Sequence, residues 1–158
     1  MPEYLPLGAF RQGLLPGDCS SCAWWQTVGS APTQGADAAD ARHEWLTDLE
    51  HDWGYVGLLV HDTGGRRETS GSQNPAITAS VHFAPASSVP RFRELPFPPL
   101  PAASALLFCL HTDDEASRLI AKRVIRRALY ELRGRGIPEV YAVAHRPEAG
   151  GAGEPACR

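Results

Sequence analysis

One segment constrains the fold more than any other, because it alternates apolar runs with an amphipathic helix. The run "SALLFCLHT" (104–112) is continuously apolar, which predicts a strand buried on both faces. A helix is predicted over about 116–133, and "EVYAVAHR" (139–146) reads as a second strand. The apolar positions of this helix recur every four residues, at Ile120, Val124, Ala128 and Leu132. Strand, helix and strand in this order form a βαβ unit, whose two strands are parallel.

Earlier in the chain, a second amphipathic segment predicts a helix over about 38–52. Asp37 suits the N-cap of this helix, and Gly54 suits its end. Its apolar positions are Trp45, Leu46, Leu49 and Trp53. The segment before it is rich in Gly, Pro and Ser and shows no sustained periodicity, so it is expected to be part loop and part strand.

Two further strands and a proline-rich stretch lie between the helices. The runs 55–62 and 76–84 read as strands that pair antiparallel across a polar turn region, 63–75. The segment 85–102 holds six prolines. Because proline fixes φ and lacks an N–H donor, this segment is predicted to be an extended loop, neither helix nor central strand.

These elements predict one α/β (α+β) domain over residues 1–146, with a mixed, mostly antiparallel sheet that contains the βαβ unit at 104–144. The last residues, 147–158, are predicted to be a disordered tail. The net charge of −3 gives the whole chain no reason to bind nucleic acid. We find no run of 18 apolar residues and no secretory signal at the start, so we expect no membrane association and a cytoplasmic location.

The stretch "CSSCAWWQ" (19–26) carries two thiols in Cys-x-x-Cys spacing, directly before two tryptophans. Three interpretations remain open. A zinc site normally needs a second pair of ligands, which the sequence lacks, so no metal is expected. A redox site normally opens a helix after a strand, which this stretch does not. Packing is favoured: Cys19 and Cys22 would be small buried or half-buried thiols beside Trp24 and Trp25.

The two predicted helices carry opposite charge. The second helix region holds seven basic residues and one acidic residue, Glu131. The basic residues are Arg118, Lys122, Arg123, Arg126, Arg127, Arg133 and Arg135. Helix N-termini attract anions, so this region either binds phosphate or is a solvated basic face. The first helix is acidic, and its charges are expected to lie on the solvated surface.

In layout the chain resembles the GNAT superfamily of acetyl-CoA-dependent N-acetyltransferases, in particular a subgroup with an N-terminal Cys-x-x-Cys followed by an aromatic pair. The likeness covers about residues 10–146 and rests on order, spacing and short local matches. The matching stretches are "CSSCAWW", "EWLTDLEHDWG", "YVGLLV", "AITASVHFAPASSVPR", "ELPFPPLP", "SALLFCLHTDD" and "RGRGIPEVYAVAH". The resemblance implies a GNAT-like fold that binds acetyl-CoA and transfers its acetyl group to an amine.

The resemblance also implies roles for particular residues. The backbone of Leu110, His111 and Thr112 would contact the pantetheine arm of the cofactor, and Arg118 and Lys122 would meet its phosphates. The amine must lose a proton before it attacks the thioester, so a general base is needed. His111 and His82 are the candidates, because histidine titrates near neutral pH.

The sequence departs from the family pattern at two places. The family motif Arg/Gln-x-x-Gly-x-Gly/Ala, which holds the cofactor pyrophosphate, corresponds here to Ala116, Leu119 and Ala121, of which only Ala121 matches. After the fifth strand the family continues with a helix and two strands, whereas twelve residues follow Arg146. The domain is therefore expected to be C-terminally truncated. Its alternative roles are a catalytically inactive binding module, which a partner or a second copy completes at the open sheet edge, or a small zinc or thiol protein.

Overall fold

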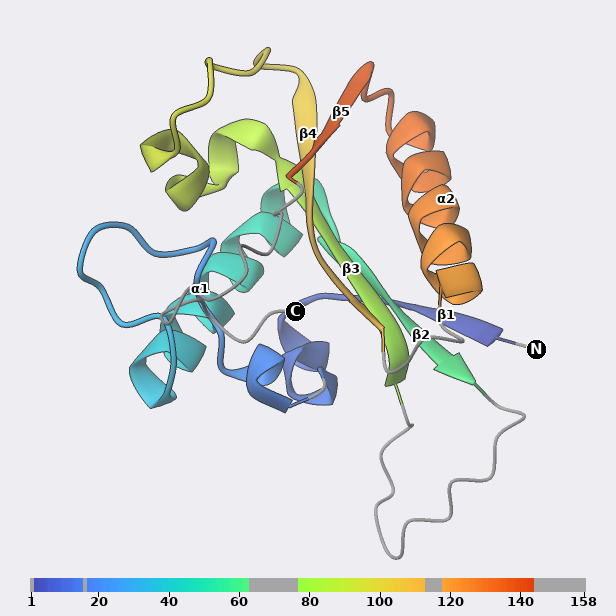
Figure 1. Cartoon of the computed structure of the whole chain (residues 1–158), viewed down its shortest axis with the longest axis horizontal. Coiled ribbons are helices and arrows are strands. Elements are labelled where there is room, and N and C mark those ends of the chain that lie inside the picture. The colour runs from blue at the N-terminus through green and yellow to red at the C-terminus, as the bar shows by residue number, and fades with distance from the viewer. Residues whose placement is uncertain (1, 16, 63–76, 113–117, 144–158) are drawn as a thin grey trace, which may run out of the picture.

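Five strands form one mixed sheet in the order β1-β2-β3-β4-β5 (Figure 1). The computed structural model describes residues 2–15, 17–62, 77–112 and 118–143. The strands are β1 (Pro2–Pro6), β2 (Gly57–Asp62), β3 (Ile77–Pro85), β4 (Ser104–Thr112) and β5 (Glu139–Ala142). Neighbours pair antiparallel from β1 to β4, and β5 pairs parallel to β4. The predicted α+β class and the parallel βαβ unit are therefore confirmed.

The strand predictions hold to within a few residues. The bounds of β4 are those predicted, and β2 and β3 each begin one or two residues later than expected. β5 takes up the first half of its predicted range. The predicted turn region 63–75 and the predicted tail 147–158 lie outside the described residues.

Two helices cover the sheet. α1 (Ala36–Trp53) lies on one face and α2 (Arg118–Gly134) on the other (Figure 1). The prediction that Asp37 caps α1 is wrong: Gly35, at φ 92°, is the N-cap, and Asp37 lies in the first turn, where a carboxylate favours the helix dipole. Gly54, at φ 93°, ends the helix as predicted.

The proline-rich stretch differs from its prediction. It contains two short 3₁₀ helices, η3 (Ala86–Ser88) and η4 (Pro90–Glu94). Proline tolerates the first position of a helix, where its missing N–H would have no partner in any case, so Pro90 starts η4 without cost. The N-terminal segment holds two more 3₁₀ helices, η1 (Ala9–Leu14) and η2 (Gly17–Ser20), which its composition did not indicate.

The two faces of the sheet carry separate apolar clusters. The face toward α2 buries alternate residues of β2, β3 and β4, and three residues of α2 fill it: Val124, Ala128 and Leu132. The face toward α1 buries Leu46 and Leu49 of that helix against Leu106 and Phe108 of β4. The apolar faces predicted for both helices are therefore confirmed.

The prediction that β4 is buried on both faces along its length is wrong. Ser104 to Phe108 are buried, but Cys109, His111 and Thr112 are half-buried and Leu110 is 38% exposed. The reason lies in the neighbouring strand: β5 pairs with β4 only from Ser104 to Leu107. Within the described residues, no strand flanks the rest of β4 on that side.

Arg135 joins the end of α2 to the end of α1. Its guanidinium lies 4.6 Å from the ring centroid of Trp53 and 4.4 Å from that of Tyr55. It also donates a hydrogen bond of 3.0 Å to the carbonyl oxygen of Tyr55. The Tyr55 hydroxyl donates to Glu131 at 2.6 Å, and burial together with this carboxylate raises the pKa of Tyr55. One cation thus connects both helices through stacking and hydrogen bonding.

We expect Arg135→Ala to lower the free energy of unfolding by about 2–3 kcal/mol, because cation–π contacts and a charged hydrogen bond are lost together. Chemical denaturation followed by circular dichroism measures this. Arg127→Ala is the matched control, within α2: Arg127 is half-exposed and pairs with Glu131 at 2.6 Å. Its loss should cost about 1 kcal/mol or less. Equal losses in the two variants would contradict the proposed role of Arg135.

Candidate functional site

A bulge in β4 shapes the site. His82 of β3 lies opposite Phe108, and Ser80 lies opposite His111. One residue thus separates the two positions on β3, whereas Cys109 and Leu110 both separate them on β4. Cys109 has φ 49°, the one non-glycine residue with positive φ in the described chain. Such an insertion re-aims the side chains that follow it.

The bulge decides which side chain faces α1. Residues opposite each other in a sheet point to the same face. In a regular ladder Leu110 would lie opposite Ser80, but the extra residue puts His111 there instead. His111 therefore shares a face with Ser80 and His82. No feature of "LLFCLHT" predicts this shift in register, because a bulge leaves the apolar pattern of a short strand unchanged.

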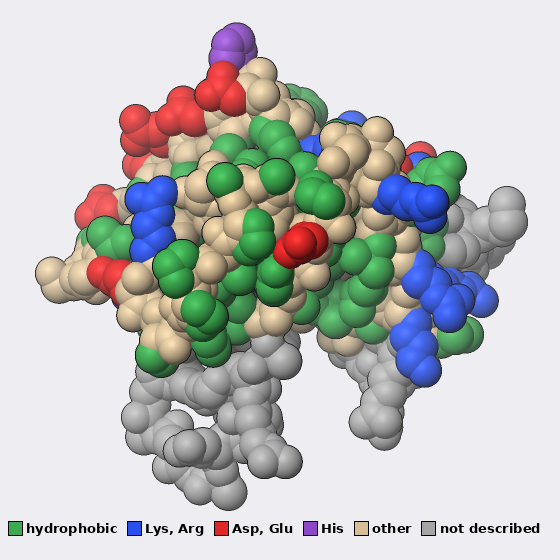
Figure 2. All heavy atoms as spheres, turned by 90° about the horizontal axis from the view of Figure 1, so that it is seen from above, with side chains coloured by type: hydrophobic (Ala, Val, Ile, Leu, Met, Phe, Trp, Pro, Cys, Tyr) green, Lys and Arg blue, Asp and Glu red, His purple; other side chains and the backbone are tan. Residues whose placement is uncertain are grey.

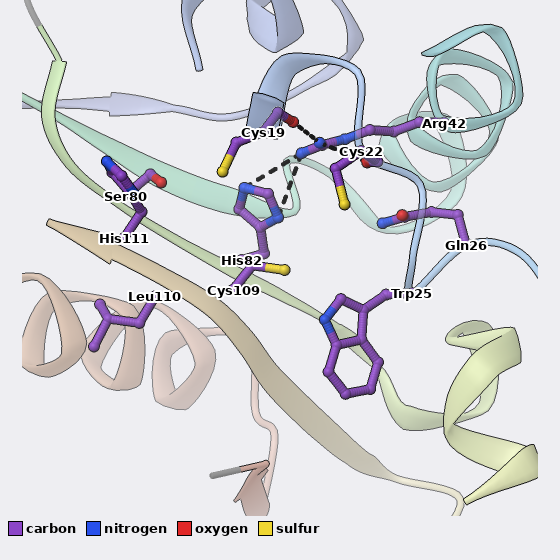
Figure 3. Close-up of a pocket in the computed structure, with 10 residues that line it drawn as sticks. All are labelled: Cys19, Cys22, Trp25, Gln26, Arg42, Ser80, His82, Cys109, Leu110 and His111. Atoms are coloured by element: carbon purple, nitrogen blue, oxygen red, sulfur yellow. Dashed lines mark hydrogen bonds between the residues drawn. The ribbon is translucent and has the colours of Figure 1, made fainter. Parts of the chain in front are cut away.

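A pocket opens on this face of the sheet, between the two strands and the N-terminal segment (Figure 3). It encloses about 390 Å³, part of which is open to solvent. β3 and β4 supply one wall, the segment around η2 supplies another, and α1 contributes one side chain. The lining residues are Cys19, Cys22, Trp25, Gln26, Arg42, Ser80, His82, Cys109, Leu110 and His111.

The stretch "CSSCAWWQ" forms the N-terminal wall of this pocket. Cys22 is 4% exposed and Cys19 is half-buried, which confirms the prediction of small buried or half-buried thiols. Trp25 lies with its ring centroid 5.4 Å from that of Phe108. Trp25, one of the two tryptophans predicted to pack beside the thiols, therefore anchors this wall to β4, whereas the ring of Trp24 lies 4.4 Å from the guanidinium of Arg91. In Figure 3 the side chains of both cysteines extend into the pocket.

Arg42 holds the wall in place from α1. It is 2% exposed, although the surrounding helix is acidic and solvated. Its Nη1 donates to the carbonyl oxygen of Cys22 at 2.9 Å and to that of Cys19. Its Nη2 lies 3.4 Å from both ring nitrogens of His82. Sequence reasoning missed this residue, and its one signal was a lone arginine inside an acidic helix.

His82 lies at the floor of the pocket. The residue is 5% exposed, and its ring meets that of Phe108 edge-on at 5.8 Å. Burial, reinforced by the nearby charge of Arg42, holds the pKa of His82 well below its usual value. His82 is therefore neutral at physiological pH, and protonating it is costly.

The structure brings some predicted site residues together and separates others. Both candidate bases, His82 and His111, line the pocket with Leu110. Thr112 is half-buried and lies just beyond it. On α2, Ala121 is half-buried and Lys122 is exposed. Arg118 begins α2, and its side chain lies outside the described part of the chain.

Charge is divided between the two sides of the molecule. All six acidic side chains of α1 are exposed, as predicted: Asp37, Asp40, Glu44, Asp48, Glu50 and Asp52. On α2 the exposed basic side chains are Lys122, Arg123, Arg126, Arg127 and Arg133. Figure 2 shows basic side chains gathered along the right flank, over α2, and acidic side chains at the opposite upper left. An anion that reaches β4 from the α2 side meets positive charge.

Two classes of binding site receive no support from the described residues. None of their His, Cys, Asp and Glu side chains form a group of three or more that could hold a metal ion. No helix in the described ranges has the length and apolar character needed to cross a membrane.

Comparison with known proteins gives a similarity to a solved structure. No family model matches the sequence, and no curated protein matches it. A solved structure, a GCN5-related N-acetyltransferase from Ralstonia eutropha JMP134, is similar to this chain. The alignment covers 100% of both chains with 16% sequence identity and a TM-score of 0.49. At this identity we carry over no residue from it.

The lowered pKa of His82 has a consequence for stability. Above pH 6.5 the residue is neutral in both folded and unfolded chains. As the pH falls below 6.5, the unfolded chain binds a proton that the folded chain resists, so folded stability is lost. We expect this residue alone to remove about 1 kcal/mol between pH 7.5 and pH 5.5. The titratable or charged groups that share its pocket are Arg42, His111, Cys19, Cys22 and Cys109.

The measurement compares urea unfolding at the two pH values for the native chain and for His82→Gln. The variant should lose less stability on acidification, by about 1 kcal/mol, whatever its absolute stability. His43→Gln, which removes an exposed histidine of α1, should keep the native dependence. The assignment fails if His82→Gln and the native chain show the same dependence on pH.

Proposed function

We propose that this protein is an N-acetyltransferase that moves the acetyl group of acetyl-CoA to an amine. The proposal rests on one observation: the bulge in β4 lies where the pairing with β5 has ended. Beyond Leu107, the β5 side of β4 has no strand partner among the described residues. In this proposal the backbone groups of Leu110, His111 and Thr112 contact the amide-containing pantetheine arm, as the resemblance to GNAT enzymes implies.

The acetyl group would lie at the bulge, with its thioester next to the pocket. A tail that runs from there toward α2 approaches Lys122 and the other basic side chains of that helix (Figure 2). Phosphate groups of the cofactor would pair with these cations. The amide groups at the start of a helix favour the same anions. The acceptor amine would then enter from the pocket on the opposite side.

His111 is the better general base of the two candidates. It is half-buried, lines the pocket, and follows the bulge directly, close to where the thioester carbonyl would lie. His82 is buried beside the positive charge of Arg42, so accepting a proton would be costly. In the proposed reaction His111 takes a proton from the ammonium form of the acceptor. The neutral nitrogen attacks the carbonyl carbon, and the C–S bond breaks. The departing CoA thiolate takes the second proton of that nitrogen and leaves as the thiol.

A second role has a specific observation in its favour. β5 forms one edge of the sheet within the described residues, and Glu139, Tyr141 and Ala142 on it are exposed. An exposed edge strand can pair with another chain. A non-catalytic module that completes its sheet with a partner or a second copy is therefore the alternative proposal. Cofactor binding separates it from the enzyme.

The first test is isothermal titration of the purified chain with acetyl-CoA. We expect binding at about micromolar strength, near −8 kcal/mol. Lys122→Ala should weaken it by about tenfold, because one phosphate contact is worth about 1–2 kcal/mol. Arg133→Ala removes an equally exposed cation at the other end of α2 and should leave the affinity unchanged. A folded chain that gives no heat at millimolar cofactor would favour the non-catalytic module.

The second test concerns the base. Against an amine panel, His111→Asn should lower kcat by about 10²–10⁴-fold, the usual contribution of a general base. Its affinity for acetyl-CoA should stay close to native, because backbone rather than side-chain atoms would hold the pantetheine arm. His43→Asn, on the exposed surface of α1, is the matched control. An unchanged kcat for His111→Asn would remove His111 from this role.

A further inference from the structure

Two thiols on one turn of the chain line the same pocket. Cys19 belongs to η2 and Cys22 follows it by three residues. Both line the pocket, and Figure 3 shows both side chains extending into it from the same wall. Neither the acetyl transfer proposed above nor the packing of Trp25 requires a second thiol at this wall. Neither of these two roles therefore explains why the wall carries a pair of thiols.

The backbone around the pair is fixed by Arg42. One nitrogen, Nη1, donates to the carbonyl oxygens of both cysteines, with 2.9 Å to that of Cys22. Both carbonyl oxygens therefore lie within hydrogen-bond reach of one nitrogen, which holds the two residues of the pair close to each other. The amide of Gln12 holds the same turn, since its Nε2 donates to the carbonyl oxygen of Ser20 at 3.0 Å. The turn is thereby kept in one shape.

This arrangement suits a bond between the two sulfur atoms better than it suits a metal ion. A disulfide needs Cα atoms within about 7 Å. Cys19 and Cys22 are three residues apart, the chain bends at Ser21 between them, and both side chains line one pocket. A metal ion would need further ligands, and the described His, Cys, Asp and Glu side chains offer no group of three.

We propose that Cys19 and Cys22 form a reversible disulfide in the wall of the pocket, and that low-molecular-weight disulfides such as oxidised glutathione drive its formation. Cys19 is half-buried and is reached first from solvent, whereas Cys22 is 4% exposed. The Cys19 thiolate attacks one sulfur of the oxidant, giving a mixed disulfide and one glutathione thiol. The Cys22 thiolate then attacks Cys19 Sγ and releases the second glutathione.

In this exchange the two protein thiols are oxidised and the glutathione disulfide is reduced to two thiols. The protons of the two cysteines pass to the two departing glutathione thiolates, so atoms and electrons balance. The exchange requires the two cysteine side chains to rotate about χ1. Arg42 keeps both backbone carbonyl groups in place meanwhile. Reduction by a dithiol reverses it.

The bond would change the pocket itself. Two thiols that line one wall become a single cross-link, which stiffens that wall opposite Cys109 and His111. If the pocket admits the acceptor amine, a consequence that rests on the proposed function, oxidation blocks acetyl transfer. Binding of acetyl-CoA on the other side of β4 is left intact. The thiol pair then makes transfer sensitive to the redox state of the cell.

The test begins with the reduced full-length chain in excess oxidised glutathione, followed by acid quench, alkylation and intact-mass measurement. We expect the loss of two alkylatable thiols, and peptide mapping should join Cys19 to Cys22. Dithiothreitol should restore both. Cys22→Ser should stop at a glutathione adduct on Cys19. Cys109→Ser, which removes the third thiol of the same pocket, is the matched control and should form the disulfide as the native chain does.

Two results would overturn the disulfide: Cys19 and Cys22 both remaining alkylatable in a folded sample, or a bond that joins either of them to Cys109. The effect on the pocket is tested separately by acetyl transfer and by acetyl-CoA titration of both forms. We expect the oxidised form to bind acetyl-CoA and to lose transfer until dithiothreitol is added. Unchanged transfer by a fully oxidised chain would overturn the regulatory effect. Failure of both forms to bind acetyl-CoA would instead overturn the proposed function and leave the disulfide standing.

Discussion

The buried guanidinium of Arg42 is the interaction on which the pocket depends. Burying a charge costs several kcal/mol unless hydrogen bonds replace the lost water. Here two carbonyl oxygens of the N-terminal turn, those of Cys19 and Cys22, supply such bonds. The segment from Cys19 to Cys22 begins in the short 3₁₀ helix η2 and carries few apolar side chains of its own, so this cation fixes its position against α1. The same group lies against His82 and adds to the effect of burial, which keeps His82 neutral.

The sheet forms the other wall of the pocket, and the bulge in β4 shapes that wall. Because β5 pairs with β4 only as far as Leu107, the strand is exposed just where its bulge begins. The bulge then turns His111 toward the pocket in place of Leu110. Phe108, immediately before it, packs against Trp25, Trp45 and His82, and so fixes the strand at this point. An exposed, kinked backbone held by a rigid aromatic cluster is suited to binding a ligand through main-chain atoms.

The regular elements could be predicted from the sequence because their signals are periodic and local. The spacing of Val124, Ala128 and Leu132 gives α2 its buried face, and the apolar run gives β4 its bounds. The site could be predicted only in part. His82 and His111 were predicted as candidate bases from their side-chain chemistry. Their place on the same face of the sheet depends on the bulge in β4, which no residue type specifies. The burial of Arg42 could not be predicted, because a basic residue in an acidic helix ordinarily lies on a solvated surface.

The two histidines of the pocket differ in environment and are therefore suited to different work. His82 lies between an aromatic ring and a cation, which keeps it neutral and makes it part of the packing. His111 lies at the half-exposed end of the bulge, where water reaches it and a proton can leave. Environments that separate two like groups in this way commonly distinguish a structural residue from a base. The pocket thus combines a histidine that burial keeps neutral, His82, with one that is only partly buried, His111.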